Sequence, residues 1–214
     1  MALYQESKKK KNLIVELVVR KYPFTINMPY DCEFNGRNYT GLAIDWLLIQ
    51  DINASFTEER PRLPGQTHPG LGLSSVVLEL LLIICWRLNL AGIINVPNHY
   101  HNAFLYSKIF YYLNPSAQSK FLALKKTFKK IPLHKTSWGM EWGCVNDLIE
   151  DNVLEWCVQH QIVPLNKDLQ KVFKSRQYKK HVQNEINKFK FSFDEEKYIS
   201  CLEKNNGKTL EKCI

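Results

Sequence analysis

Apolar and polar residues alternate along the first quarter of the chain, which is the pattern typical of strands. Residues 13–20 and 22–28 form two such runs, and residues 42–56 form a longer one. Asn35-Gly36, a strong hairpin signal, lies between Cys32-Glu-Phe and Asn38-Tyr-Thr. The first 56 residues are therefore predicted to form an antiparallel meander.

The pattern changes from residue 66 onward. Residues 66–73 are a glycine-containing turn, and they lead directly into a strongly apolar run that predicts a buried helix ending near Leu90. Residues 91–96 follow as a short strand, which we expect in the middle of the sheet because it has no polar face. Residues 98–112 show helical spacing and predict a second helix.

The part of the chain after Pro115 is predicted to be helical. Residues 116–130 read as a basic amphipathic helix with Phe121, Leu124 and Phe128 on its apolar face. A tryptophan-rich segment follows, and its side chains should pack this part of the chain against the first part. Residues 165–193 are predicted to be helical and charged, and the last 20 or so residues to be frayed.

Composition and charge narrow the class of protein. The chain has 214 residues, of which 45% are hydrophobic and 23% are charged, as in ordinary globular proteins. Its net charge of +8 suits an anionic partner such as nucleic acid, an acidic membrane surface or a phosphorylated cofactor. The apolar run of residues 76–96 contains Glu79 and Arg87, so we expect no transmembrane segment. Six cysteines without C-x-x-C spacing, and no secretory signal, predict reduced thiols and a cytoplasmic location.

The turn at Gly70-Leu-Gly72 carries the clearest chemical signal. Glycine allows a tight turn and close approach of a ligand, and the first turn of the following helix leaves free N–H groups with a partial positive charge. Together these features favour a phosphate or pyrophosphate site. The alternative is an ordinary loop in front of a core helix.

The order of these elements resembles that of the Gcn5-related N-acetyltransferases (GNAT superfamily). The resemblance rests on the Gly70-Leu-Gly72 turn with its long helix, on the short strand, and on the helix carrying Leu105-Tyr106-Ser-Lys108 and the pair Tyr111-Tyr112. It covers roughly residues 40–112. Thr67 stands where the family has Gln or Arg, and no obvious final pair of strands follows Pro115.

The resemblance implies a fold and an activity. The fold class is α/β (α+β), with a mostly antiparallel, splayed sheet flanked by helices. Residues 1–114 would form an acyl-coenzyme A-binding core, and residues 115–214 a basic, tryptophan-containing helical extension packed on it. The activity would be transfer of an acetyl or longer acyl group from acyl-coenzyme A to an amine on a small molecule or a protein.

The same resemblance assigns roles to individual residues. The residues that would hold the cofactor are Gln66, His68, Gly70, Leu71, Gly72, Leu73, Ser74 and Asn102. Tyr106 would protonate the leaving thiolate. Glu58 and His99 are candidates for the base that takes a proton from the amine, with Asp51 and Glu59 as further candidates.

Three other functions remain open at this point. The chain could be a binding module that keeps the fold without the chemistry. It could be a metal-dependent hydrolase that uses His68, His99 and His101, although two histidines two residues apart diverge by about 200° on a helix. Residues 120–135 could contact nucleic acid, but neither a metal site nor a nucleic-acid partner is our expectation.

Overall fold

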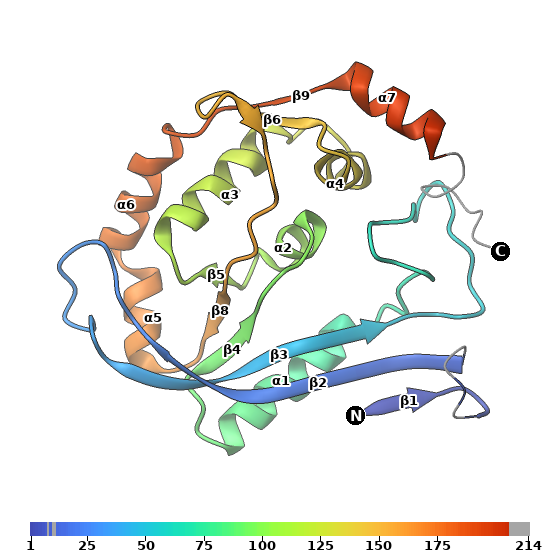
Figure 1. The fold of residues 1–214 in the computed structure, drawn as a ribbon. Coiled ribbons are helices and arrows are strands. Elements are labelled where there is room, and N and C mark those ends of the chain that lie inside the picture. Colours follow the sequence, from blue (N-terminus) through green and yellow to red (C-terminus); the bar gives the residue numbers. More distant parts are fainter. Residues whose placement is uncertain (8, 10–11, 206–214) are drawn as a thin grey trace.

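The computed structural model describes residues 1–7, 9 and 12–205, and it shows a mixed α/β fold (Figure 1). The strands are β1 (Ala2–Tyr4), β2 (Leu13–Thr25), β3 (Asn38–Ile49), β4 (Gly92–Asn95), β5 (Tyr111–Tyr112), β6 (Val145–Asp147), β7 (Asn152–Val153), β8 (Gln161–Pro164) and β9 (Phe191–Phe193). The helices are α1 (Ser74–Arg87), α2 (Tyr100–Tyr106), α3 (Pro115–Thr127), α4 (Leu133–Glu141), α5 (Lys167–Lys174), α6 (Arg176–Ile186) and α7 (Glu195–Lys204).

The main sheet has the strand order β1-β2-β3-β4-β8-β5, and β7-β6-β9 form a second, small sheet. The first three strands are antiparallel, which confirms the predicted meander in part, since β1 was not predicted and residues 50–56 form no strand. The runs 13–20 and 22–28 are largely one strand, β2. Residues 32–34 form no strand, because the Asn35 side chain accepts from the Met28 N–H and donates to the Tyr30 carbonyl, holding this segment as a loop.

The sheet opens between β3 and β4. These two strands are parallel, and they pair only from Leu42 with Ile93 to Ile44 with Asn95. Beyond that last pair, β4 ends while β3 continues to Ile49, still bonded to β2 on its other edge. The sheet is therefore splayed at its centre, and one edge of β3 faces a gap there.

Strand β8 is the main departure from the predicted organisation. It comes from the part of the chain expected to be helical, yet it lies between β4 and β5 and pairs antiparallel with both. Pairing with β8 also draws residues 111–112 out of the predicted second helix, so α2 ends at Tyr106. Strand β4 is buried along its whole length in the middle of the sheet, as predicted.

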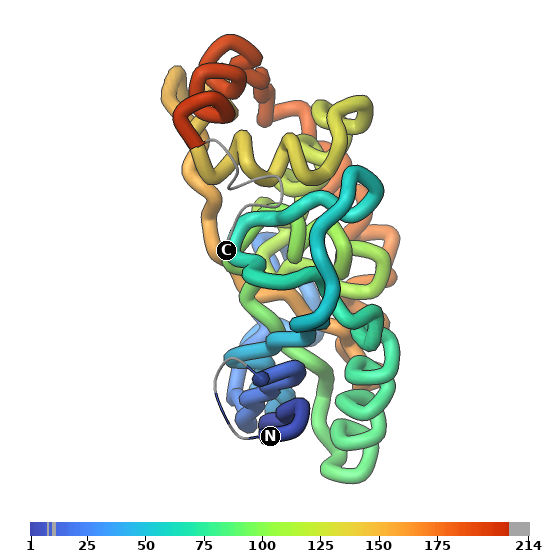
Figure 2. Tube along the Cα trace, turned by 90° about the vertical axis from the view of Figure 1, so that its right-hand side faces the viewer, coloured from blue at the N-terminus to red at the C-terminus, as the bar shows by residue number. Residues whose placement is uncertain are grey.

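Helices cover both faces of the main sheet. Helix α1 packs Val77, Leu81 and Cys85 into one cluster, which contains Ile93 of β4. The neighbouring residue Ile94 points to the opposite face, where it joins side chains of α5 and α6. A further cluster unites α2, α3 and α4. In Figure 2, α1 lies along one side of the molecule with its outer surface uncovered by the rest of the drawn chain.

The C-terminal half of the chain contacts the first half through its tryptophans, as predicted. Trp138 of α4 donates a hydrogen bond to the Arg62 carbonyl at 2.8 Å, and Trp156 donates to the Pro97 carbonyl at 2.9 Å. The apolar face predicted for the basic helix is buried in α3 and just beyond it.

Two predictions for the tail differ from the structure. Residues 165–193 contain α5 and α6 but end in strand β9, which pairs with β6. Residues 195–204, expected to be frayed, form α7, and Asp194 caps that helix by accepting from the Lys197 N–H. Residues 206–214 lie outside the described residues.

Candidate functional site

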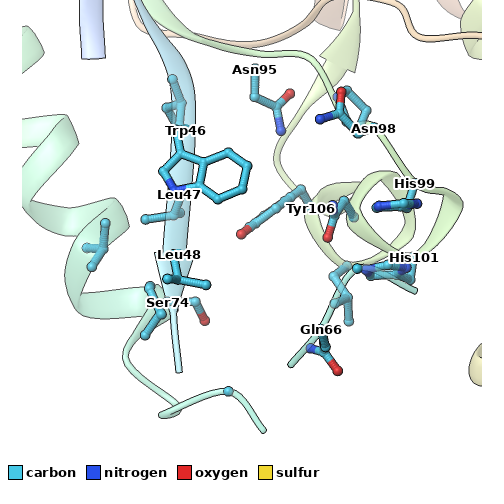
Figure 3. Close-up of a pocket in the computed structure, with 18 of the residues that line it drawn as sticks. Trp46, Leu47, Leu48, Gln66, Ser74, Asn95, Asn98, His99, His101 and Tyr106 are labelled. Carbon is cyan, nitrogen blue, oxygen red and sulfur yellow. The ribbon is translucent and has the colours of Figure 1, made fainter. Parts of the chain in front are cut away.

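A cavity of about 490 Å³ lies where β3 and β4 diverge. Its walls are the final residues of β3, the loop of residues 64–73, the first turns of α1, the segment after β4, and α2. Figure 3 shows side chains from these separate elements converging on one space. The splay of the sheet thus creates the cavity, and the loop and helices enclose it.

Most of the predicted site residues line this one cavity. The predicted cofactor-binding residues in its wall are Gln66, His68, Gly70, Leu71, Gly72, Leu73, Ser74 and Asn102. Tyr106 and His99 line it as well. The structure therefore brings together ten residues that the sequence spreads over 41 positions, from 66 to 106.

Glu58 is the exception, because it is exposed and is not part of the cavity wall. Residues 57–60 form a closed turn, in which the Thr57 and Arg60 backbones bond to each other, and this turn does not carry the carboxylate to the cavity. Glu59 accepts from the Thr57 hydroxyl, and its pKa is lowered by a backbone hydrogen bond and by this contact. The acidic residue in the wall is Asp45, which pairs with Arg20 at 2.9 Å.

The glycine turn has the geometry of an open anion site. Gly72 has φ +77°, a left-handed conformation that favours glycine, and a Cβ there would meet no atom within 4 Å. Leu73 occupies the cap position of α1, with no side-chain hydrogen bond to the helix and no acidic residue in the first turn. The first N–H groups of α1 therefore have neither an intrahelical acceptor nor a side-chain cap, and the helix dipole adds positive potential there.

The loop before α1 is held in place by its own side chains. Arg60 donates to the Gly70 carbonyl at 2.6 Å, and Arg62 donates to the Gln66 carbonyl at 2.7 Å. Thr67 donates to the side chain of Gln50 at 3.0 Å, which ties the loop to the end of β3. Both arginines thus shape the turn.

Tyr106 projects from α2 into the cavity, with its hydroxyl directed toward the β3 side where Leu47 and Leu48 lie (Figure 3). Its ring packs against Phe110 with centroids 5.7 Å apart. Burial raises the pKa of the phenol above its ordinary value. The hydroxyl is therefore protonated at neutral pH and can act as a proton donor.

The two histidines at positions 99 and 101 stack on each other, with ring centroids 5.3 Å apart and planes 11° apart. The divergence expected on a helix does not arise, because His99 has an extended backbone and precedes the helix. His99 Nδ1 lies 3.2 Å from a carboxylate oxygen of Glu141, and its Nε2 lies against Gly65. The part of the chain that the structure describes holds no group of three or more His, Cys, Asp or Glu side chains suited to a metal ion.

The sequence did not single out Asn95 at the cavity, and it suggested His101 only as a metal ligand. Asn95, the last residue of β4, points its amide into the cavity (Figure 3), while its Oδ1 is buried and has no hydrogen-bond partner among the described residues. The same holds for Nδ1 of His101, whose pKa falls to about 4 through burial and the neighbouring His99. The sequence signal that could have identified Asn95 is its place as a polar residue at the end of the otherwise apolar strand β4.

Three of the six lysines in the segment considered for nucleic-acid contact have partners within the chain. Lys120 pairs with the buried carboxylate of Asp147 at 3.6 Å. Lys125 donates to Ser107, and Lys135 pairs with Glu195. These three side chains therefore link α3 and α4 to neighbouring parts of the fold.

No protein-family model, curated protein or solved structure matches this chain. Among the described residues, no helix has the length and apolar character needed to cross a membrane. The class is thus defined by the fold and the site together: a mixed α/β protein whose splayed central sheet holds a cavity against the uncapped start of a helix.

Proposed function

We propose that this protein is an acyltransferase of the GNAT type, which moves an acetyl or longer acyl group from acyl-coenzyme A to an amine. One observation carries the proposal: a single cavity joins the uncapped start of α1, the free edge of β3 and the Tyr106 hydroxyl. The order β3, α1, β4, α2 is the order on which the resemblance rests.

The turn and the first turn of α1 would hold the diphosphate of the cofactor. Backbone N–H groups of Leu71, Gly72, Leu73 and Ser74 are the donors. The open space over Gly72 leaves room for the phosphate oxygens. When bound, acyl-coenzyme A supplies an activated thioester carbonyl for attack by an amine.

The remaining groups of the cavity would act on the acyl transfer itself. Residues 45–49 of β3 lie beyond the last pair with β4, so alternate N–H groups of that edge can polarise a carbonyl. Tyr106 would donate its proton to the departing thiolate. His99, oriented by Glu141, would accept the proton of the amine.

The binding step is tested by adding a negative charge at the start of α1. Ser74 lines the cavity, whereas Ser75, in the same helical turn, does not. Ser74→Glu should weaken acetyl-coenzyme A binding by more than about tenfold in calorimetry, because like charges meet in the site. Ser75→Glu places the same charge on the same helix end and should weaken binding clearly less. Equal losses in the two variants, or no binding to the unmodified protein, would contradict the proposal.

The chemical step is tested with Tyr106→Phe. The variant keeps the ring that packs on Phe110, so acetyl-coenzyme A binding should be unchanged. Turnover with a panel of amines should fall about 100-fold or more, since a positioned proton donor is lost. Binding without turnover of any amine in the unmodified protein would instead favour the non-catalytic binding module.

A further inference from the structure

The outward face of α1 is apolar and lies in solvent. The exposed fractions are 50% for Val76, 49% for Leu80, 42% for Ile83 and 81% for Trp86. At 100° per residue, Val76 and Ile83 fall at the middle of this face, with Leu80 and Trp86 on either side of it. Contiguous exposed apolar surface of this kind marks an interaction site in a folded protein.

Two opposite charges are placed symmetrically on the same face. Glu79 lies one turn before Ile83 and Arg87 lies one turn after it, each four residues away. Both side chains are exposed, and within the described chain neither makes an ion pair. Along the helix axis, this face therefore presents a negative charge at Glu79, an apolar centre at Ile83 and a positive charge at Arg87.

We propose that this face is the interface of a homodimer, in which α1 of a second copy packs antiparallel and crosses at Ile83. A two-fold axis through that contact sets Glu79 of each copy level with Arg87 of the other, and Leu80 level with Trp86. Two ion pairs then flank one apolar contact. A pattern that is complementary to its own reverse is what an isologous interface requires.

The same charges argue against a membrane as the occupant. A helix that lies on an anionic bilayer carries lysine and arginine along its polar border. Here Glu79 lies within the apolar face, one turn from its centre, where it would meet the lipid surface. A second copy neutralises Glu79 with an arginine, and a bilayer does not.

The size of the face predicts a dimer of moderate affinity. Fourteen residues of α1 span about 21 Å, and exposed Leu73 and Leu88 extend the apolar surface past its two ends. Stable interfaces bury about 800 Å² of surface on each partner. A single helix face buries less than this, so the area points to the small end of stable interfaces. Association should therefore depend on protein concentration in the micromolar range.

Sedimentation equilibrium of the full chain, at roughly 1 to 100 µM, tests the proposal. The unmodified protein should shift from monomer to dimer over this range. Ile83→Glu should abolish the shift, because it sets two like charges on the symmetry axis. Ile199→Glu is the matched control, since Ile199 has a similar exposed fraction, 48% against 42% for Ile83, but lies on α7; this variant should dimerise normally.

A charge-reversal series distinguishes this interface from any other. Glu79→Arg and Arg87→Glu should each weaken dimerisation by about tenfold or more, since each opposes like charges twice. The double variant restores opposite charges and should return to within about threefold of the unmodified protein. A chain that stays monomeric, a dimer indifferent to Ile83→Glu, or a double variant no better than the single ones would overturn the proposal. So would binding of the monomer to phosphatidylserine vesicles through this face.

Discussion

Replacing Asn95 with leucine should make the protein more stable, although the substitution lies in the central strand. Asn95 is 8% exposed, and its Oδ1 is shielded from water and has no partner among the described residues. A buried polar atom without a partner costs about 1–3 kcal/mol. Leucine has the same branching at Cγ, and the adjacent cavity provides room for its larger methyl groups.

The expected gain is about 2 kcal/mol, which raises the melting temperature of a chain of this length by roughly 6 °C. Calorimetry and urea unfolding would both measure it. Gln118→Met is the matched control, because Gln118 is equally buried but its Oε1 accepts from the Tyr112 N–H at 2.8 Å. In this control the free energy of unfolding should fall by about 1–3 kcal/mol, because the buried Tyr112 N–H is left without an acceptor.

The two variants together decide whether the reasoning holds. If Asn95→Leu melts below the unmodified protein while Gln118→Met behaves as expected, Oδ1 is bonded in the folded protein and the argument from an unpaired oxygen is refuted. If the proposed function is correct, Asn95→Leu should also slow acyl transfer, because polar groups kept unpaired in a cavity are ones that function requires.

Two further predictions concern pH and the sheet. Burial depresses the folded-state pKa of His101 to about 4, whereas the ordinary pKa of histidine is about 6.5. As the pH falls below about 6.5, the unfolded chain therefore takes up a proton before the folded chain does. The free energy of unfolding should be highest above that pH and should fall by roughly 3 kcal/mol toward pH 4. His101→Leu should flatten this part of the urea-unfolding profile, and an equal loss in both proteins would contradict the assignment. Gly92→Ala should cost at least about 3 kcal/mol, since its Cβ would lie 2.4 Å from the Val163 carbonyl oxygen in the ladder. Gly70→Ala, whose Cβ would lie 3.8 Å from the Ile49 carbonyl oxygen, should unfold like the unmodified protein; equal stability of the two variants would show that β4 and β8 are not paired so closely.

The elements with strong local signals were predictable from the sequence alone. Apolar spacing identified α1 and the buried face of α3, and an apolar run identified β4. The turn at Gly70-Leu-Gly72 marked the start of α1, and ten of the eleven predicted site residues meet at one cavity. These features depend on neighbouring residues, whose periodicity and backbone preferences the sequence displays directly.

Tertiary structure alone decided how distant segments pair. No local pattern shows that residues 161–164 enter the sheet between β4 and β5, because a four-residue strand owes its stability to its two partners. The same pairing shortens α2, and the divergence of β3 from β4 opens the cavity. The positions of Glu58 and His101 relative to that cavity also depend on the packing of segments that are far apart in the chain. No single stretch of the sequence contains this information.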